Sequence, residues 1–147
     1  MILSDAQATH EAGRLLAPHL QIGDVIGLSG DLGAGKTSFA RGLLEGLGLA
    51  EEAPSPSYAI VIPYDPPLVR LSVWHVDLYR LDSQSEVVEL GLDDALSYGA
   101  LLIEWPERLG ARNWAETLRL RFEILESGGR RLTVGVPPSW ETRCPFR

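Results

Sequence analysis

The stretch GDLGAGKTSFARGL (30–43) has the spacing G-x-x-x-x-G-K-T. The apolar run VIGLS (25–29) comes before it, and from about residue 36 to 47 apolar residues recur at helical spacing. A buried strand, a glycine-rich turn and a helix in this order form the context of the Walker A motif, or P-loop, which binds nucleotide phosphates. We therefore interpret this stretch as a P-loop; the alternative is a glycine-rich turn that only caps a helix.

The residue types in this loop suit a polyphosphate. Glycine lets backbone N–H groups come close and aim at the anion, and a helix N-terminus adds partial positive charge. Lys36 is the only lysine, against 12 arginines, and its ammonium suits the β- and γ-phosphates as a point charge. Thr37 offers a hydroxyl to Mg²⁺. The residues predicted to bind the phosphates are Asp31, Gly33, Ala34, Gly35, Lys36, Thr37 and Ser38.

Composition limits the class of protein. A chain of 147 residues with 45% hydrophobic and 22% charged residues predicts a single globular domain, residues 1–147. The net charge of −7 disfavours a protein that grips nucleic acid by bulk electrostatics. The single cysteine, Cys144, forms no internal disulfide, and we find neither a secretory signal nor a run long enough to cross a membrane. We expect a cytoplasmic protein.

The remaining pattern alternates strands and helices. Residues 4–20 predict a helix with Ser4 and Gln7 as a capping box, which Pro18 ends or kinks. Residues 83–92 predict a second helix with the capping box Ser83 and Glu86. The segment 137–147 has no periodicity, and we expect it to be loosely held. The other predicted strands are an antiparallel hairpin (58–63 and 68–76), a buried parallel-type strand (100–104) and a C-terminal hairpin (118–124 and 131–136).

Two carboxylates follow buried apolar runs, where a P-loop protein handles Mg²⁺ and water. Glu104 follows ALLI in the manner of a Walker B acid, and Asp77 follows SVWHV. The alternatives are a solvated acid at a strand end for Glu104 and a turn or cap acid for Asp77.

Three other features have two interpretations each. Trp105 either borders the nucleotide or belongs to the core. His75 is interpreted as a strand-end residue with a satisfied hydrogen bond, with catalysis as the alternative. Residues 50–57 form a switch loop or a plain connection.

Four stretches in order, GDLGAGKTSFARGL, SPSYAIVIPY, WHVDLYRL and LIEWPERLG, resemble the bacterial TsaE (YjeE) family over residues 5–109. The resemblance implies a P-loop ATPase with a mixed sheet between helices. Its members help to make threonylcarbamoyladenosine beside the anticodon of ANN-decoding tRNAs, together with TsaB, TsaC and TsaD. We therefore predict an α/β fold: a single P-loop NTPase domain with a mixed, mostly parallel sheet flanked by helices and a C-terminal antiparallel hairpin.

The resemblance also implies roles for individual residues. Lys36 and Thr37 correspond to the P-loop lysine and threonine, and Glu104 to the metal-binding glutamate. Asp77 corresponds to the acid of the HxDLYRL motif and Trp105 to the tryptophan after the glutamate. The serine of the family's SPT motif corresponds to Ser55, and a threonine placed against the adenine to Thr9. Where the family commonly reads SPTYTLV, this chain reads SPSYAIV, so Ser57 keeps a hydroxyl and Ala59 loses one.

These observations predict catalytic roles for Lys36, Asp77 and Glu104, a Mg²⁺ site at Thr37 and Glu104, and ATP as the nucleotide. The expected partners are TsaD and TsaB, with tRNA reached only indirectly and no membrane. We expect a weak ATPase that these partners stimulate. A small-molecule kinase and a nucleotide-dependent binding module without turnover remain as alternatives, although residues 83–99 contain no arginine that could serve a kinase lid.

Overall fold

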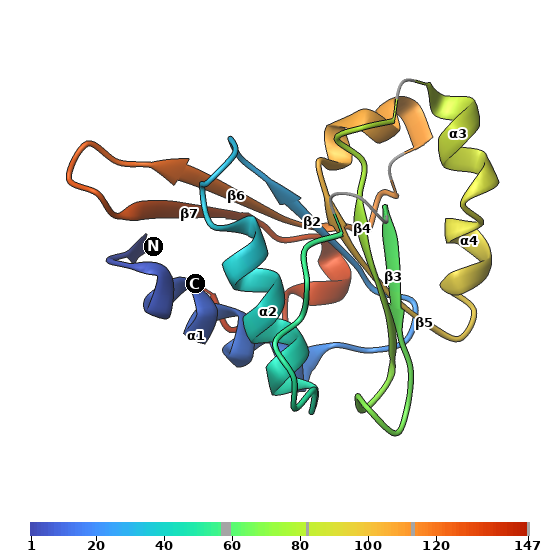
Figure 1. The fold of residues 1–147 in the computed structure, drawn as a ribbon, viewed down its shortest axis with the longest axis horizontal. Coiled ribbons are helices and arrows are strands. Elements are labelled where there is room, and N and C mark those ends of the chain that lie inside the picture. Colours follow the sequence, from blue (N-terminus) through green and yellow to red (C-terminus); the bar gives the residue numbers. More distant parts are fainter. Residues whose placement is uncertain (57–59, 82, 113, 147) are drawn as a thin grey trace.

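The computed structural model describes residues 1–56, 60–81, 83–112 and 114–146 and contains a mixed seven-stranded sheet between helices (Figure 1). The strand order is β1-β7-β6-β2-β5-β4-β3. The four central strands, β6, β2, β5 and β4, pair in parallel, whereas β1, β7 and β3 pair antiparallel at the two edges. The strands are β1 (Ile2–Leu3), β2 (Val25–Ser29), β3 (Val61–Tyr64), β4 (Ser72–Asp77), β5 (Gly99–Glu104), β6 (Leu118–Ile124) and β7 (Arg130–Gly135).

Helices cover both faces of this sheet (Figure 1). The helices α1 (Ala6–Leu16) and α2 (Lys36–Gly46) pack on one face, and α3 (Gln84–Glu89) and α4 (Leu92–Ala95) pack on the other. Alternate residues of β5 serve the two cores: Ala100 and Leu102 face α1 and α2, whereas Leu101 and Ile103 face α3 and α4. This double burial explains the uninterrupted apolar run that predicted the strand. Short 3₁₀ segments occur at Ala17–His19, Pro106–Arg112 and Pro138–Trp140.

The predicted α/β fold is confirmed. The strand at 25–29, the helix that follows the P-loop and both antiparallel hairpins are present. The strand β1 was not predicted, because a pair of residues is too short to show alternation. In the described part of the chain, no helix has the length and apolar character to cross a bilayer.

Both predicted capping boxes are wrong. The first helix begins one residue later than Ser4 suggests, because the side chain of Asp5 caps it by accepting a hydrogen bond from the Ala8 N–H (2.8 Å). Ser83 occupies the N-cap position of α3 but makes no side-chain cap bond, and its hydroxyl pairs with that of Ser85 instead (2.8 Å). Pro18 ends α1 as predicted, since the chain continues as a 3₁₀ turn.

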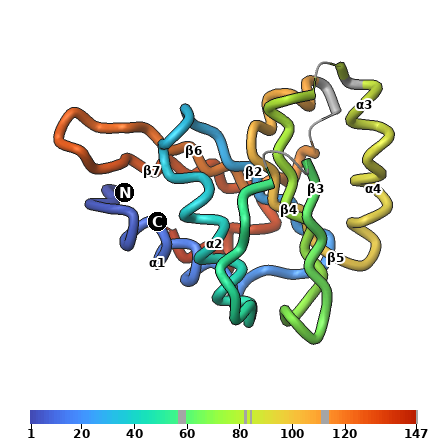
Figure 2. The backbone as a smooth tube through the Cα atoms, in the orientation of Figure 1, coloured from blue at the N-terminus to red at the C-terminus, as the bar shows by residue number. Residues whose placement is uncertain are grey.

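The C-terminal segment packs tightly, contrary to the expectation of a loosely held tail. Trp140 is 0% exposed, and the ring of Phe146 lies 6.3 Å from that of Phe39 on α2. Arg143 stacks on Trp140 and forms a bidentate pair with Asp24 (2.7 Å for both bonds). These contacts bring Phe146 to the face of the sheet that carries α1, where it lines a cavity together with Met1, and the two ends of the chain lie near each other in Figure 2.

The two helices α1 and α2 cross with almost no side-chain layer between them. A Cβ atom added to Gly42 would lie 1.9 Å from the carbonyl oxygen of His10, and one added to Gly13 would lie 2.2 Å from that of Phe39. Only glycine at these positions permits this close approach. The crossing sets the distance between α1 and the loop that precedes α2.

Candidate nucleotide-binding site

The P-loop connects the end of β2 to the start of α2. Its glycines Gly30, Gly33 and Gly35 have φ values of +141°, +80° and +115°. Gly35 is the N-cap of α2 and has no side chain to cap the helix, so the N–H groups of the first turn stay open to an anion. The first turn of α2 contains no acidic residue that would repel one.

A cavity of about 180 Å³ lies over this helix start. It brings together most of the residues predicted from sequence, although they come from α2, β4, β5 and the loop. Its lining consists of Leu32, Gly33, Gly35, Lys36, Thr37, Ser38, Asp77, Glu104 and Trp105. Two predicted phosphate-binding residues, Asp31 and Ala34, are outside this lining, and the Ala34 N–H donates to the Asp31 carbonyl (3.0 Å) within the loop.

The two predicted acids are neighbours at the carboxyl edge of the sheet. Asp77 and Glu104 end β4 and β5 and lie directly opposite each other in the parallel register. Glu104 is also level with Leu28 of β2, so it stands next to the strand that leads into the P-loop. Both are buried, with 7% of Asp77 and 4% of Glu104 exposed. Asp77 accepts a hydrogen bond from the Tyr79 N–H (2.9 Å), which fixes one of its oxygens.

Lys36 is held inside the loop. Its ammonium donates to the carbonyls of Gly30 and Asp31, the latter at 3.0 Å, and lies 4.3 Å from the ring centroid of Trp105. Burial lowers the pKa of Lys36 below its ordinary value of 10.5, while the negative charges of Glu104 and Asp77 act in the opposite direction. The site therefore places one partly desolvated cation in the same cavity as two carboxylates.

Trp105 has a backbone conformation that is unusual for a bulky residue. Its φ is +62°, and its N–H donates to the carbonyl of Leu28 (3.1 Å). This conformation turns the ring toward Lys36 and stacks it at a tilt on Tyr79, with 4.8 Å between the centroids. Such strained residues persist where the surroundings impose them, and they cluster at functional sites. Trp105 is half-buried and forms one wall of the cavity.

A second cavity, of about 140 Å³, adjoins the first across Gly33, Gly35 and Ser38. Thr9 of α1 lines it, whereas it is absent from the first cavity. Gly35 faces Thr9 so closely that an added Cβ would lie 3.2 Å from the threonine methyl. Arg130, at the start of β7, also lines this second cavity, and its guanidinium donates to the carbonyl of Gly33 (3.1 Å), which connects the C-terminal hairpin to the P-loop.

The sequence did not identify several residues at this site, among them Leu32, Arg130 and the partner of Glu104. Arg130 contacts a residue 97 positions away, and no local pattern encodes such a contact. The partner of Glu104 is His75, whose Nε2 lies 2.7 Å from the carboxylate, so the satisfied hydrogen bond expected for this histidine is present. Ser57 and Ala59 lie outside the described residues.

The donors in the first cavity fit a Mg²⁺ ion that also binds a nucleotide. Mg²⁺ prefers one or two carboxylates, water and phosphate oxygens. The Thr37 side chain and the Glu104 carboxylate line the same cavity, and Asp77 lies beside them. Among the described residues, no group of three or more His, Cys, Asp or Glu side chains could hold a metal by itself. Phosphate oxygens would have to complete the coordination.

The strand, loop and helix, with acids at the ends of the adjacent parallel strands, define the class: the protein has the fold of a P-loop NTPase. A family model described as "Threonylcarbamoyl adenosine biosynthesis protein TsaE" matches residues 3–132. The chain therefore belongs to the TsaE family, as its sequence motifs predicted. The match extends beyond residues 5–109, on which the resemblance rested, and includes most of the C-terminal hairpin.

Individual relatives agree with this assignment. The chain is 35% identical over 130 residues to the "tRNA threonylcarbamoyladenosine biosynthesis protein TsaE" of Treponema pallidum, covering 88% of this chain and 94% of the relative. It is 42% identical over 119 residues to the protein of the same name from Streptomyces coelicolor, covering 77% of each. The crystal structure of Bacillus subtilis YdiB superposes with a TM-score of 0.82 at 29% identity, covering 98% of this chain and 89% of that one.

Proposed function

We propose that this protein is a Mg²⁺-dependent ATPase that acts, as a helper of TsaB and TsaD, in the threonylcarbamoyladenosine modification of tRNA. Membership of the TsaE family supports the role in this biosynthesis. One observation about the site supports the ATPase activity most directly. The P-loop lysine, the P-loop threonine and two strand-end carboxylates, from separate parts of the chain, line a single cavity.

In this proposal the phosphates rest on the first turn of α2. Its open N–H groups and positive dipole end bind the β- and γ-phosphate oxygens. Lys36 donates to the same oxygens, and their negative charge raises its pKa, which opposes the effect of burial. The base and ribose extend toward the second cavity, where Thr9 lies against the adenine. Trp105 shields the phosphate end from solvent.

Hydrolysis requires a bound cation and an oriented water. Thr37 and Glu104 would hold Mg²⁺, which neutralises part of the charge that develops on the transferred phosphoryl group. Asp77 accepts a hydrogen bond from the attacking water and so aims its oxygen at the γ-phosphorus. The water oxygen bonds to the γ-phosphorus as the bond from this phosphorus to the bridging oxygen breaks, and ADP leaves with the electron pair of the broken bond. One proton of the water is released to solvent, and the other stays on the inorganic phosphate.

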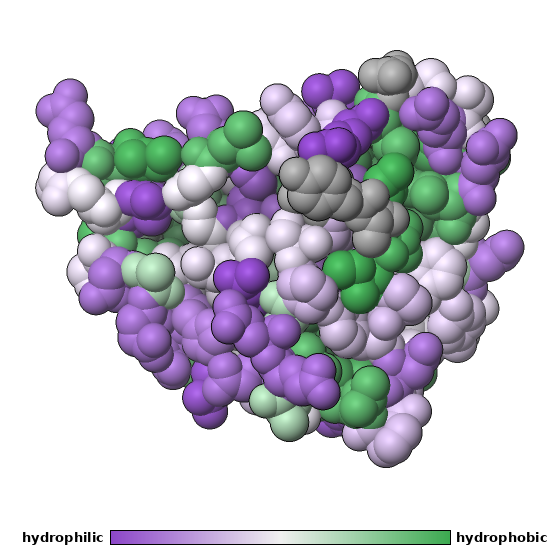
Figure 3. Space-filling view, viewed as in Figure 1, coloured by the Kyte–Doolittle hydropathy of each residue, from purple (hydrophilic) through white to green (hydrophobic). Residues whose placement is uncertain are grey.

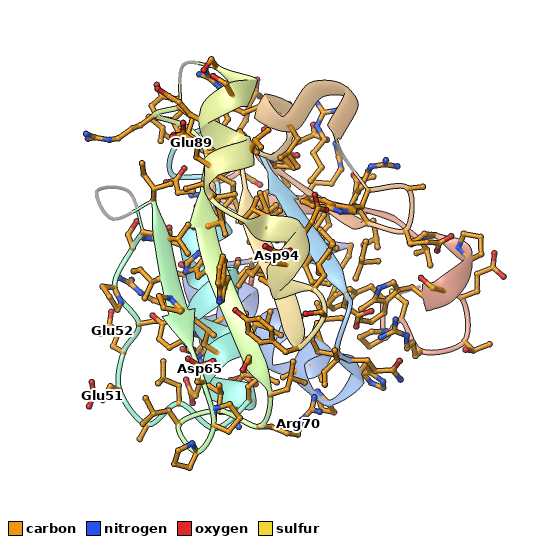
Figure 4. The ribbon with its side chains drawn as sticks, turned by 90° about the vertical axis from the view of Figure 1, so that its right-hand side faces the viewer. Glu51, Glu52, Asp65, Arg70, Glu89 and Asp94 are labelled. Carbon is orange, nitrogen blue, oxygen red and sulfur yellow. The ribbon has the colours of Figure 1, made fainter. Side chains whose placement is uncertain are left out.

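The partners act on the loop that follows α2. Arg41 anchors the start of this loop through the Ala53 carbonyl (2.7 Å) and Glu52 (3.3 Å), while Glu51 and Glu52 point outward (Figure 4). We propose that TsaB and TsaD contact residues 50–64 and that this contact raises a slow basal turnover. Polar residues dominate the surface over α1 and α2, and the net charge is −7 (Figure 3). The negative net charge disfavours a direct grip on tRNA and so supports action through protein partners, which we propose takes place in the cytoplasm.

Phosphate release tests this proposal. The purified protein is assayed with ATP or GTP and Mg²⁺, alone and with TsaB and TsaD. We expect slow release alone, stimulation by the pair, and loss of both in Glu104→Gln. Glu89→Gln on α3, which lies at the face of the sheet away from α2, is the matched control and should keep full activity (Figure 4). Mg²⁺-dependent release by Glu104→Gln would refute the metal assignment.

The assay also separates the remaining alternatives. Tight nucleotide binding without release under any condition would indicate a binding module, and transfer to added small acceptors would indicate a kinase. Lys36→Arg tests whether positive charge alone or the compact shape of the ammonium is needed for turnover. We expect low activity, because the larger guanidinium does not fit a loop whose carbonyls already enclose the ammonium. Near-normal turnover by this variant would show that positive charge alone suffices.

A further inference from the structure

A buried histidine lies one row below the carboxyl edge of the sheet. His75 of β4 is level with Leu102 of β5 and therefore diagonal to Glu104, two residues further along that strand. Its Nε2 lies 2.7 Å from Oε2 of Glu104. His75 is 0% exposed, so no bulk water competes for this contact. The pair connects the interior of the sheet to the floor of the first cavity.

The geometry fixes which ring nitrogen donates. An ionised carboxylate can only accept, so Nε2 carries the hydrogen and donates it to Oε2 of Glu104. The other nitrogen, Nδ1, is buried and has no hydrogen-bond partner among the described residues. A buried polar atom without a partner disfavours folding, and an apolar side chain would avoid this cost. Among the described residues, the bond to Glu104 is therefore the single polar contact of the ring.

We propose that His75 is a positioning residue that holds the Glu104 carboxylate in the orientation required to bind the cation. This inference rests on the proposed function of Glu104 as the Mg²⁺ ligand. His75 occupies Oε2, which leaves the remaining electron pairs of the carboxylate to the cation. The histidine does not touch the nucleotide or the reacting atoms.

The chemistry of the acid explains why a positioning residue is needed. The usual Walker B acid is aspartate, and glutamate has one more rotatable bond between the backbone and the carboxylate. Mg²⁺ demands near-ideal octahedral geometry and tolerates a misplaced ligand poorly. A hydrogen bond from a rigid, buried ring removes the extra freedom of Glu104. Carboxylates that bind metals are commonly fixed by such outer hydrogen bonds, whose loss costs about 10- to 100-fold in metal affinity.

Two amide variants, which differ by one methylene group, test the proposal. His75→Gln places an amide N–H close to the former Nε2 position, whereas His75→Asn places it near the former Nδ1 position, out of reach of Glu104. Binding of Mn²⁺ to the ADP complex is measured by electron paramagnetic resonance, and ADP affinity is measured separately in EDTA. Urea titrations of both variants report folding. We expect His75→Gln to bind Mn²⁺ within about threefold of the wild type and His75→Asn to lose about 10- to 100-fold.

Affinity for ADP in EDTA should stay unchanged in both variants, because His75 acts only through the cation ligand. Equal Mn²⁺ affinity in the Gln and Asn variants would overturn the proposal, as would a loss of ADP affinity in EDTA. If His75→Asn does not fold, the wild type decides: Mg²⁺ added to its ADP complex must shift the ¹⁵N resonance of the His75 Nε2, and an unmoved signal overturns the proposal. Glu104→Gln tests the proposed function separately, since Mn²⁺ binding that survives it refutes Glu104 as the ligand, whatever His75 does.

Discussion

Replacing Gly42 by alanine should push α1 away from α2. The added Cβ would lie 1.9 Å from the carbonyl oxygen of His10. An unstrained contact between a carbon and a carbonyl oxygen is about 3.3 Å or longer, so α1 must retreat by about 1.4 Å to relieve the clash. Overpacking of this kind costs about 3 kcal/mol at its upper end, and the better helix propensity of alanine offsets about 1 kcal/mol. The net loss in the free energy of unfolding is then about 2 kcal/mol.

Urea denaturation followed by circular dichroism measures this loss. With a slope of about 2 kcal/mol per molar urea, the midpoint should fall by about 1 M. The same movement has a functional consequence, because Thr9 precedes His10 on α1 and lies against Gly35 in the second cavity. We therefore expect Gly42→Ala to weaken ATP binding as well, even at urea-free conditions where the variant is fully folded.

Gly46→Ala provides a graded control on the same helix. Its Cβ would meet the Cβ of Ala17 at 2.6 Å, which requires a retreat of about 0.9 Å to reach an ordinary carbon–carbon contact near 3.5 Å. Its loss of stability should therefore be smaller, and Thr9 lies further away along α1. Equal losses in the two variants, or a Gly42→Ala variant as stable as the wild type, would refute the argument that the helix crossing sets the geometry of the loop.

Three further predictions concern the tail and the P-loop lysine. Trp140→Ala should lower the free energy of unfolding by about 3–5 kcal/mol in urea titrations, since Trp140 is 0% exposed. A loss below about 1 kcal/mol would instead support the expectation from sequence that residues 137–147 are loosely held. Arg143→Met should lower the free energy of unfolding by about 3 kcal/mol, because it leaves the Asp24 carboxylate without its bidentate partner. When the same change is made in an Asp24→Asn variant, most of this loss should disappear. Lys36, the chain's only lysine, should give one ¹⁵Nζ signal whose pKa lies below 10.5, because burial lowers the pKa of the ammonium. Addition of ATP should raise this pKa again, and a pKa at or above 10.5 without ATP would contradict the prediction. Because the lowered pKa penalises the charged form in the folded state, the Lys36 contribution to stability should rise as the pH increases from that pKa to 10.5.

Sequence reasoning predicted the parts of this protein that are encoded locally. The strand, P-loop and helix at residues 25–47 are contiguous, so spacing and periodicity suffice to identify them. The acids Asp77 and Glu104 were found because a carboxylate after a buried run is also a local pattern. Their position opposite each other follows from parallel pairing of β4 and β5, which makes strand ends meet at one edge.

The features that the sequence did not reveal depend on contacts between distant or irregular segments. The tail has no periodicity, because single side chains such as Trp140 rather than a helix face attach it to the core. The choice of Asp5 over Ser4 as the cap depends on which side chain reaches the Ala8 N–H, and both residue types are good caps. The bond from Arg130 to Gly33 requires the hairpin to lie beside the P-loop, which only the assembled sheet establishes.

The charges of the residues at the site indicate which combination of nucleotide and cation would be balanced there. Lys36 is the one cation among the described residues that line the first cavity, and the buried carboxylates of Asp77 and Glu104 carry the opposite charge. A triphosphate would add three to four negative charges to this balance, so the chain's own groups leave an excess that a divalent cation must neutralise. The hydrogen bond from His75 holds one oxygen of the Glu104 carboxylate. Under the proposed function, this arrangement would favour the metal–nucleotide complex over the free nucleotide. Glu104, the proposed metal ligand, ends a strand in the parallel centre of the sheet, where pairing on both sides holds its backbone.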